Sequence, residues 1–392
     1  MRAAIITHYY NSENYGGLLQ SYALTHVLVS LGVEAQQLSY NRAHEYKNNK
    51  GKKGYFLGAL KSSARRIYIG SRFLLPRLKH PGISKNLNKR SLAIAKFREN
   101  IIPHSEKIYD AGTVAESNGE YDIFITGSDQ VWHPQAVCGA YLLSFAGDNK
   151  RKFSYAASIA SNSLPKKLAE NFKKELGSYS GISVREENAV EILRELCPYH
   201  IECSLDPVLL LTRDEWDEIL PESKVKGEYI FCYFLGDGVL ARQAAEKFAK
   251  DKKLKLVNLA HMGGYKKCDD GFGDSQLYDV SPADFVCLIK NAQYIFTDSF
   301  HASAFSSLYN KQYFVFAREG TKTIDMSSRI YTLTKLFNSS SHYCDSDEKM
   351  TAEYIDGLEK INYTVSTGEF EKRKKQSIEY IKKNIDFARE ER

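Results

Sequence analysis

Short apolar segments alternate with amphipathic ones along most of this 392-residue chain. Apolar runs of strand length cover residues 2–8, 33–40, 122–126 and 152–158 in the first half, and 229–235, 255–260, 294–297 and 313–316 in the second. Segments with helical periodicity lie between them, for example 18–31, 165–176, 187–196, 240–250 and 282–291. Strands that alternate with helices predict an α/β fold with parallel sheets.

The pattern divides into two halves of the same kind. We expect an N-terminal domain over residues 1–211 and a C-terminal domain over 212–392, because the polar segment 212–226 follows a strand predicted for 200–211. The segment from residue 369 onward has Ile378, Ile381 and Ile385 at helical spacing. It predicts a helix that packs one face on the body and crosses back to the first domain.

Composition narrows the class of protein. Apolar residues make up 43% and charged residues 26%, as in a globular domain, and no apolar run approaches the roughly 18 residues of a spanning helix. Seven scattered cysteines form no C-x-x-C pair, and no histidine pair has zinc-site spacing. We therefore expect reduced thiols, no metal and a cytoplasmic location; the first residues predict a strand rather than a signal peptide.

Positive charge is concentrated in one region, about residues 47–107. It contains sixteen Lys and Arg residues and two acidic residues, which gives a local charge of +14. The net charge of the whole chain is +6, so the residues outside this region carry a net charge of −8. One interpretation is a segment that makes peripheral contact with an anionic membrane or a lipid-linked substrate. The other, slightly favoured, is a solvated insertion. Binding of nucleic acid is the lowest-ranked interpretation, because the region contains no recognisable DNA- or RNA-binding module.

The segment 294–303 contains the main candidate for chemistry. It predicts a strand, a polar corner at Asp298 and Ser299, and a helix with His301 in its first turn. Strand ends of this kind carry ligand sites in open α/β sheets, helix N-terminal N–H groups bind anions, and imidazole titrates near neutral pH. The alternative is a helix capped by Asp298 or Ser299 beside an incidental histidine.

Other candidates lie at comparable positions. Gly16 and Gly17 either permit close approach of the backbone to a ligand or simply form a turn. Ser128, Asp129 and Gln130 follow a strand and either line a ligand site or form an Asx-type turn. Arg185 offers a fork to a carboxylate or phosphate, or pairs with a neighbouring glutamate. Arg318 and Lys322 follow the strand next to the His301 corner.

Six stretches together resemble the polysaccharide pyruvyl transferase family. They are Tyr15-Gly-Gly-Leu-Leu-Gln-Ser-Tyr-Ala-Leu24, Asp122-Ile-Phe-Ile-Thr-Gly-Ser-Asp-Gln-Val-Trp132, Ser154-Tyr-Ala-Ala-Ser158, Ser183-Val-Arg-Glu-Glu187, Leu205-Asp-Pro-Val-Leu209 and Thr297-Asp-Ser-Phe-His-Ala302. Relatives often have Arg-Leu-His where this chain has Ser299-Phe-His301. The histidine is kept and the arginine is not, so the cations at the site are expected from Arg185, Arg318 or Lys322.

The resemblance implies two Rossmann-like domains facing across a cleft, as in GT-B glycosyltransferases. It implies transfer of pyruvate from phosphoenolpyruvate onto a sugar diol of a cell-surface polysaccharide precursor as a cyclic ketal, with phosphoenolpyruvate as donor substrate and no cofactor. We then expect His301 as acid/base and Asp298 as the group that orients it. Arg185, Lys322 and Arg318 would hold the donor, with Ser299 beside them. Gly16, Gly17, Ser128, Asp129 and Gln130 would face the glycan acceptor, which is lipid-linked in one version of the hypothesis.

Two alternatives stay open. The first is a GT-B nucleotide-sugar glycosyltransferase, for which no glycine loop or glutamate clearly supplies a nucleotide site. The second is a non-catalytic glycan-binding relative that kept the fold. Nucleic acid is not an expected partner under any of the three hypotheses.

Overall fold

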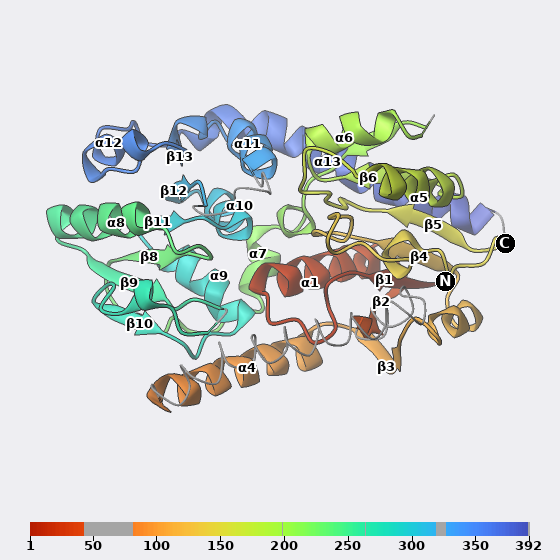
Figure 1. The fold of residues 1–392 in the computed structure, drawn as a ribbon, viewed down its shortest axis with the longest axis horizontal. Helices are drawn as coiled ribbons and strands as arrows, with labels where there is room; N and C mark the ends of the chain where they lie inside the picture. The colour runs from red at the N-terminus through yellow and green to blue at the C-terminus, as the bar shows by residue number, and fades with distance from the viewer. Residues whose placement is uncertain (43–80, 198, 263, 319–326, 391–392) are drawn as a thin grey trace, which may run out of the picture.

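A computed structural model describes residues 1–42, 81–197, 199–262, 264–318 and 327–390 (Figure 1). Most of the basic region, and Lys322, lie outside the described residues. The described residues form two α/β units side by side, each built on its own sheet, as the alternating pattern predicted.

The first sheet has the order β3-β2-β1-β4-β5, and its paired strands are parallel. A parallel pair, β6 and β7, is joined to β5 by isolated bridges, including one between Phe153 and Gly181. The described residues of this unit form seven strands: β1 (Arg2–Ile6), β2 (Glu34–Tyr40), β3 (His104–Tyr109), β4 (Ile123–Thr126), β5 (Arg151–Ser154), β6 (Ile182–Val184) and β7 (Ile201–Cys203). The helices of this unit are α1 (Tyr15–Ser30), α4 (Pro81–Ile101), α5 (Lys166–Leu176) and α6 (Glu187–Arg194).

The second sheet has the order β10-β9-β8-β11-β12-β13 and is also parallel. Its strands are β8 (Tyr229–Tyr233), β9 (Lys255–Leu259), β10 (Ser275–Leu277), β11 (Tyr294–Thr297), β12 (Gln312–Phe316) and β13 (Tyr343–Cys344). Its helices are α8 (Val239–Lys252), α9 (Pro282–Asn291), α10 (Phe300–Leu308), α11 (Ser327–Leu336) and α12 (Ala352–Asp356). Every residue of β4 and β8 is buried, which is why these strands are continuous apolar runs rather than alternating ones.

The expected strand at 200–211 is wrong beyond its first residues. Only β7 is extended; Pro207–Leu209 forms a 3₁₀ turn, and the short helix α7 (Arg213–Asp217) follows. Asp206 caps the turn by accepting a hydrogen bond from the Val208 N–H at 3.1 Å. A proline preceded by a capping aspartate starts a helical turn, and this local signal outweighs the apolar character of the segment.

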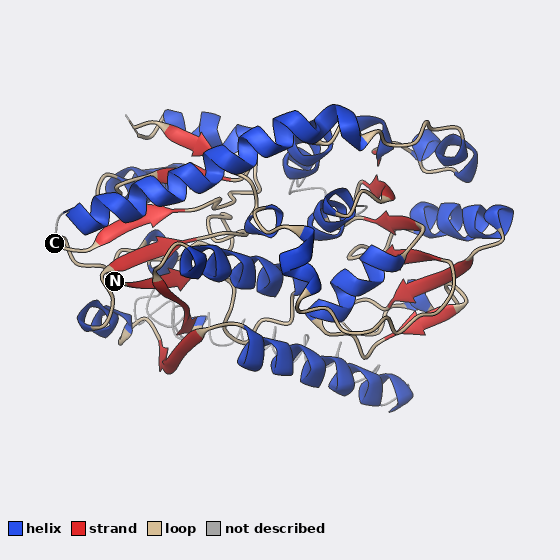
Figure 2. Ribbon diagram, turned by 180° about the vertical axis from the view of Figure 1, so that it is seen from behind, coloured by secondary structure: helices blue, strands red, loops and turns tan. Residues whose placement is uncertain are grey.

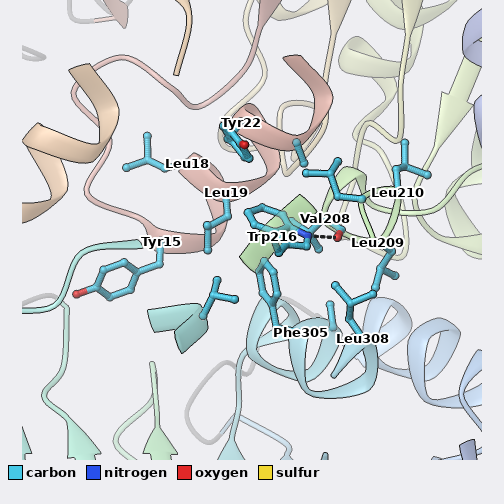
Figure 3. Close-up of a cluster of buried hydrophobic side chains, with 14 of the residues drawn as sticks. Tyr15, Leu18, Leu19, Tyr22, Val208, Leu209, Leu210, Trp216, Phe305 and Leu308 are labelled. Carbon is cyan, nitrogen blue, oxygen red and sulfur yellow. Dashed lines mark hydrogen bonds between the residues drawn. The ribbon is translucent and has the colours of Figure 1, made fainter. Parts of the chain in front are cut away.

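The two units share one apolar core (Figure 3). Trp216 of α7 is fully buried between α1, the 3₁₀ turn and α10; its indole N–H donates to the Val208 carbonyl at 3.0 Å, and its ring meets Phe305 edge-on at 4.9 Å. Tyr15 of α1 stacks on Phe285 of α9 at 5.2 Å. These aromatic contacts fix the two sheets relative to each other.

Two helices bridge the units. Helix α4 runs beneath both in Figure 1, and its Arg90 donates to the carbonyls of His261, Leu277 and Tyr278 in the second unit. Helix α13 (Tyr363–Glu390) leaves the second unit and lies across the first, as Figure 2 shows from behind. Its crossing back to the first domain agrees with the prediction from the isoleucine spacing.

Candidate active site

The polar corner between β11 and α10 has the predicted form. Ser299 is the N-cap of α10: its hydroxyl accepts from the Ala302 N–H at 3.4 Å, and its own N–H donates to the Thr297 hydroxyl at 3.0 Å. His301 lies in the first turn of α10 and is 7% exposed. Ser299 therefore fixes where the helix begins, and the imidazole is held among buried groups.

The imidazole of His301 packs directly against Gly16 at the start of α1. A Cβ added to Gly16 would lie 2.0 Å from His301 Nδ1 and 2.3 Å from Cγ, closer than real Cβ contacts. Only glycine permits this approach between the two units. Gly17 differs, because a Cβ there would meet its nearest atoms, the His8 carbonyl oxygen and groups of Asn14 and Asp129, at 3.5–3.6 Å.

The carboxylate nearest the imidazole comes from Asp206, not from Asp298. Asp206 Oδ2 lies 3.6 Å from His301 Nε2, an ion-pair distance when the ring is protonated. Asp298 instead accepts hydrogen bonds from the Leu235 and Gly236 N–H groups, both at 2.7 Å. The orienting role expected for Asp298 is corrected by these contacts: Asp298 holds the loop after β8, and Asp206 faces His301.

Arg185 follows β6 and is 3% exposed. Its guanidinium donates to Asp206 at 2.6 Å and to Asp129 at 3.4 Å. Burial by itself would raise the pKa of both carboxyls, but the charges of Arg185 and His301 hold both pKa values below the usual range. The alternative given for Arg185, an ion pair with a neighbouring glutamate, is not the one formed: its ion-pair partners are Asp129 and Asp206.

The loop after β4 is fixed by polar contacts. Ser128 donates its N–H to the Gln20 side-chain oxygen at 3.0 Å, and its carbonyl accepts from the Thr7 hydroxyl at 2.8 Å. Ser128 thus anchors the loop, while Asp129 and Gln130 reach the neighbours of His301. The Gln130 amide, with its oxygen toward α11, accepts from both terminal nitrogens of Arg329 at 2.8 and 2.9 Å.

Arg329 is a site residue that the sequence did not indicate. It lies in the first turn of α11 and is 4% exposed. Its guanidinium carbon is 5.8 Å from the centre of the Phe300 ring, and that of Arg185 is 4.6 Å from the same ring. Burial, together with the charge of Arg185, lowers the pKa of Arg329 to about 10. A polar helix start carries no local signal of such a role.

His8, at the end of β1, was also missed. Its Nδ1 is 3.1 Å from the Tyr141 hydroxyl. Burial lowers the pKa of His8, although the charge of Asp129 opposes the shift. The remaining predicted cation, Arg318, donates from Nε to the Asp298 carboxylate at 3.4 Å and from Nη2 to the Asp298 carbonyl at 3.1 Å. Arg318 thus belongs with the loop after β8.

Three residues that contact the Phe300 ring each have a buried side-chain nitrogen with no hydrogen-bond partner among the described residues. These nitrogens are Arg185 Nε, His301 Nε2 and Arg329 Nε. Buried polar groups are nearly always paired in folded proteins, so a concentration of unpaired ones marks a place where a bound group completes the set. Across the described ranges, no cluster of three or more His, Cys, Asp or Glu side chains is placed to hold a metal ion.

A model of the polysaccharide pyruvyl transferase family matches residues 14–320. The chain belongs to this family. It is therefore a transferase, and the family implies a glycan acceptor. The match includes Gly16, Asp129, Arg185, Asp206 and His301 and ends before Arg329. No curated protein gave a match.

Solved structures place this pyruvyl transferase family member among GT-B folds. The UDP-GlcNAc 2-epimerase from Methanocaldococcus jannaschii matches with 12% identity and a TM-score of 0.50, over 93% of this chain and 94% of that chain. The same enzyme in complex with UDP-GlcNAc and UDP matches with 12% identity and a TM-score of 0.50, over 99% and 100%. The Neisseria meningitidis enzyme bound to UDP-GlcNAc has 12% identity and a TM-score of 0.45, over 98% and 100%. The likeness to the M. jannaschii enzyme shows the fold: two Rossmann-like domains in the GT-B arrangement.

In the described part of this transferase, none of the helices has both the length and the apolar character that crossing a membrane requires.

Proposed function

We propose that this transferase moves pyruvate from phosphoenolpyruvate onto two hydroxyls of one sugar in a cell-surface polysaccharide precursor, forming a cyclic ketal. The observation that carries the proposal is that Arg185, His301 and Arg329, grouped about one phenylalanine ring, each have a buried nitrogen without a hydrogen-bond partner among the described residues. A donor with a carboxylate and a phosphate needs cations and a proton donor together.

The reaction is balanced with one donor, one diol and no cofactor. A proton is added to the methylene carbon of phosphoenolpyruvate, which becomes the methyl group. One sugar hydroxyl oxygen bonds to the adjacent carbon and loses its proton. The second hydroxyl oxygen then bonds to the same carbon as the carbon–oxygen bond to phosphate breaks; its proton passes to the departing phosphate, which leaves as inorganic phosphate.

His301 is the group suited to transfer these protons. Its ring is fixed on one side by Gly16 and faces Asp206 on the other. After giving its proton to the methylene carbon, the neutral ring can accept the proton of the attacking hydroxyl. Positioned acid/base groups of this kind contribute about 10²–10⁴-fold to a rate. Asp206 and Arg185 are positioning residues: Asp206 faces the ring, and Arg185 holds Asp206.

Nucleotide-sugar chemistry is the competing hypothesis, because the M. jannaschii epimerase of the same fold was solved with UDP-GlcNAc and UDP. The two hypotheses differ in donor. Ketal transfer releases inorganic phosphate from phosphoenolpyruvate, whereas a glycosyltransferase releases a nucleotide from a nucleotide sugar.

The test is incubation of the purified protein with phosphoenolpyruvate and a panel of deacylated polysaccharide repeat units. Released phosphate is measured, and the acid-labile pyruvate ketal is detected by mass spectrometry. We expect acceptor-dependent phosphate release that His301→Ala abolishes and the exposed-histidine control His200→Ala preserves. Product formation only from a nucleotide sugar would replace this proposal with the glycosyltransferase hypothesis. Glycan binding without phosphate release in the presence of any acceptor would favour the hypothesis of a non-catalytic glycan-binding protein.

A further inference from the structure

Arg329 differs from the other buried arginines of the described chain. Arg90 donates to three carbonyls, Arg185 binds two aspartates and Arg242 binds Asp269 at 3.1 Å. Arg329 is equally buried, but its only hydrogen-bond acceptor among the described residues is the neutral amide of Gln130. A buried charge without a charged partner is costly, so such groups persist where a ligand supplies the counter-charge.

The surroundings of Arg329 are suited to an anion. The guanidinium groups of Arg185 and Arg329 both lie against Phe300, the residue before His301. Arg185 already has Asp129 and Asp206 as ion-pair partners, whereas no described carboxylate lies within ion-pair distance of Arg329, and the charges of Glu186 and Asp129 act on it only from farther away. Its pKa of about 10, lowered by burial and by Arg185, still leaves Arg329 charged at neutral pH. An incoming oxyanion would therefore be drawn to Arg329 first.

We propose that Arg329 binds an oxyanion of the donor through its guanidinium, whose Nε has no hydrogen-bond partner among the described residues, with the Gln130 amide as the group that yields to the ligand or joins it. A planar guanidinium matches the geometry of carboxylate and phosphate. The assignment rests on the proposed function for the identity of the donor. It goes beyond the family match, which ends at residue 320.

This role makes a prediction that a structural role does not. Replacing a paired buried charge destabilises a fold, whereas replacing an unpaired one with a neutral side chain of similar length removes an uncompensated cost. Arg329→Gln should therefore melt at or above the temperature of the wild-type protein without ligand, yet lose the stabilisation that ligand gives. Function and stability would change in opposite directions.

The experiment uses the full chain and makes two measurements. Thermal unfolding is followed without ligand and in the presence of phosphoenolpyruvate, inorganic phosphate or pyruvate. The KM for phosphoenolpyruvate is determined from the rate of phosphate release. We expect wild-type protein to be stabilised by phosphoenolpyruvate and Arg329→Gln not to be, with KM raised about 10- to 100-fold. The control is Lys335→Gln, which removes an equal charge from the exposed face of the same helix and should behave as wild type. Loss of the phosphate response would assign Arg329 to the phosphate end of the donor, and loss of the pyruvate response to the carboxylate end.

Two results would overturn the assignment. A phosphoenolpyruvate response and KM in Arg329→Gln equal to those of wild type would remove Arg329 alone and leave the proposed function standing. No response of the wild-type protein to any of the three compounds would remove both. If the Gln variant does not fold, Arg329→Lys takes its place: it keeps the charge but not the planar fork, and an unchanged KM in that folded variant would equally refute the role.

Discussion

Replacing Asp206 with asparagine tests the buried charge network most directly. The Asp206 side chain is fully buried, and its Oδ2 lies 2.6 Å from Arg185 Nη1. The other terminal nitrogen of Arg185, Nη2, lies 3.4 Å from Asp129 Oδ1. Asparagine has the same shape and keeps an oxygen for the Val208 N–H, so the loss is electrostatic. Breaking a buried ion pair from one side costs about 3–5 kcal/mol of unfolding free energy, and the surviving Asp129 contact places this case near about 3 kcal/mol.

The assay is urea unfolding at pH 7 followed by circular dichroism. The control is Asp251→Asn, because Asp251 pairs with Lys247 at 2.8 Å but is half exposed. Water screens that pair, so the control should leave the unfolding midpoint nearly unchanged. If Asp206→Asn shifted the midpoint no more than Asp251→Asn does, the buried network would not contribute to stability as argued.

The same network predicts a dependence on pH. Both Asp129 and Asp206 have folded-state pKa values below that of an unfolded aspartate, about 3.9. Their contribution to stability is therefore complete above that value and is lost as pH falls through the folded-state pKa, because the unfolded chain then binds more protons. Wild-type stability should fall below about pH 4, and Asp206→Asn should show a shallower fall. Parallel curves for the two proteins would contradict the assignment.

Two further predictions concern packing. Gly16→Ala should reduce kcat/KM for transfer by about 100-fold or more, because the added methyl group displaces His301. Gly17→Ala is the control and should retain most activity. Equal losses of kcat/KM in the two variants would contradict the close approach at Gly16. Trp216→Ala should lower the unfolding free energy by about 3–5 kcal/mol, because the substitution leaves a cavity in the core shared by both units. Urea unfolding measures this loss. A loss below about 1 kcal/mol would mean that the two units are stable without the Trp216 side chain.

The predictable part of the site is the part encoded locally. The strand, corner and helix around His301 follow from a change of hydrophobic period within ten residues, and the loop after β4 follows from a strand that ends in polar residues. Asp298 was misassigned because neighbourhood in sequence does not tell which way a side chain at a corner faces. Asp206 lies in an apolar stretch that predicts a strand, whereas its Asp-Pro pair starts a 3₁₀ turn.

Contacts between the two units could not be predicted from the sequence. The approach of Gly16 to His301 joins residues 285 positions apart, and it depends on how α1 packs beside α10. Arg329 is inconspicuous in sequence because its burial arises from Phe300 and Gln130, which come from other elements. Such residues become visible only when unpaired buried atoms are located in three dimensions.

Helix α13 has a consequence for how the protein is made. Its Ser377 hydroxyl accepts from the Leu205 N–H at 3.0 Å, next to Asp206, and its Tyr380 hydroxyl donates to the Ser154 carbonyl at 3.0 Å. Residues 363–390 are synthesised long after the domain on which they lie. Domains usually fold in the order in which they leave the ribosome. Here, the segment that carries Asp206 receives its last supporting contacts only after the second domain has been translated, so a nascent chain should acquire activity late and all at once.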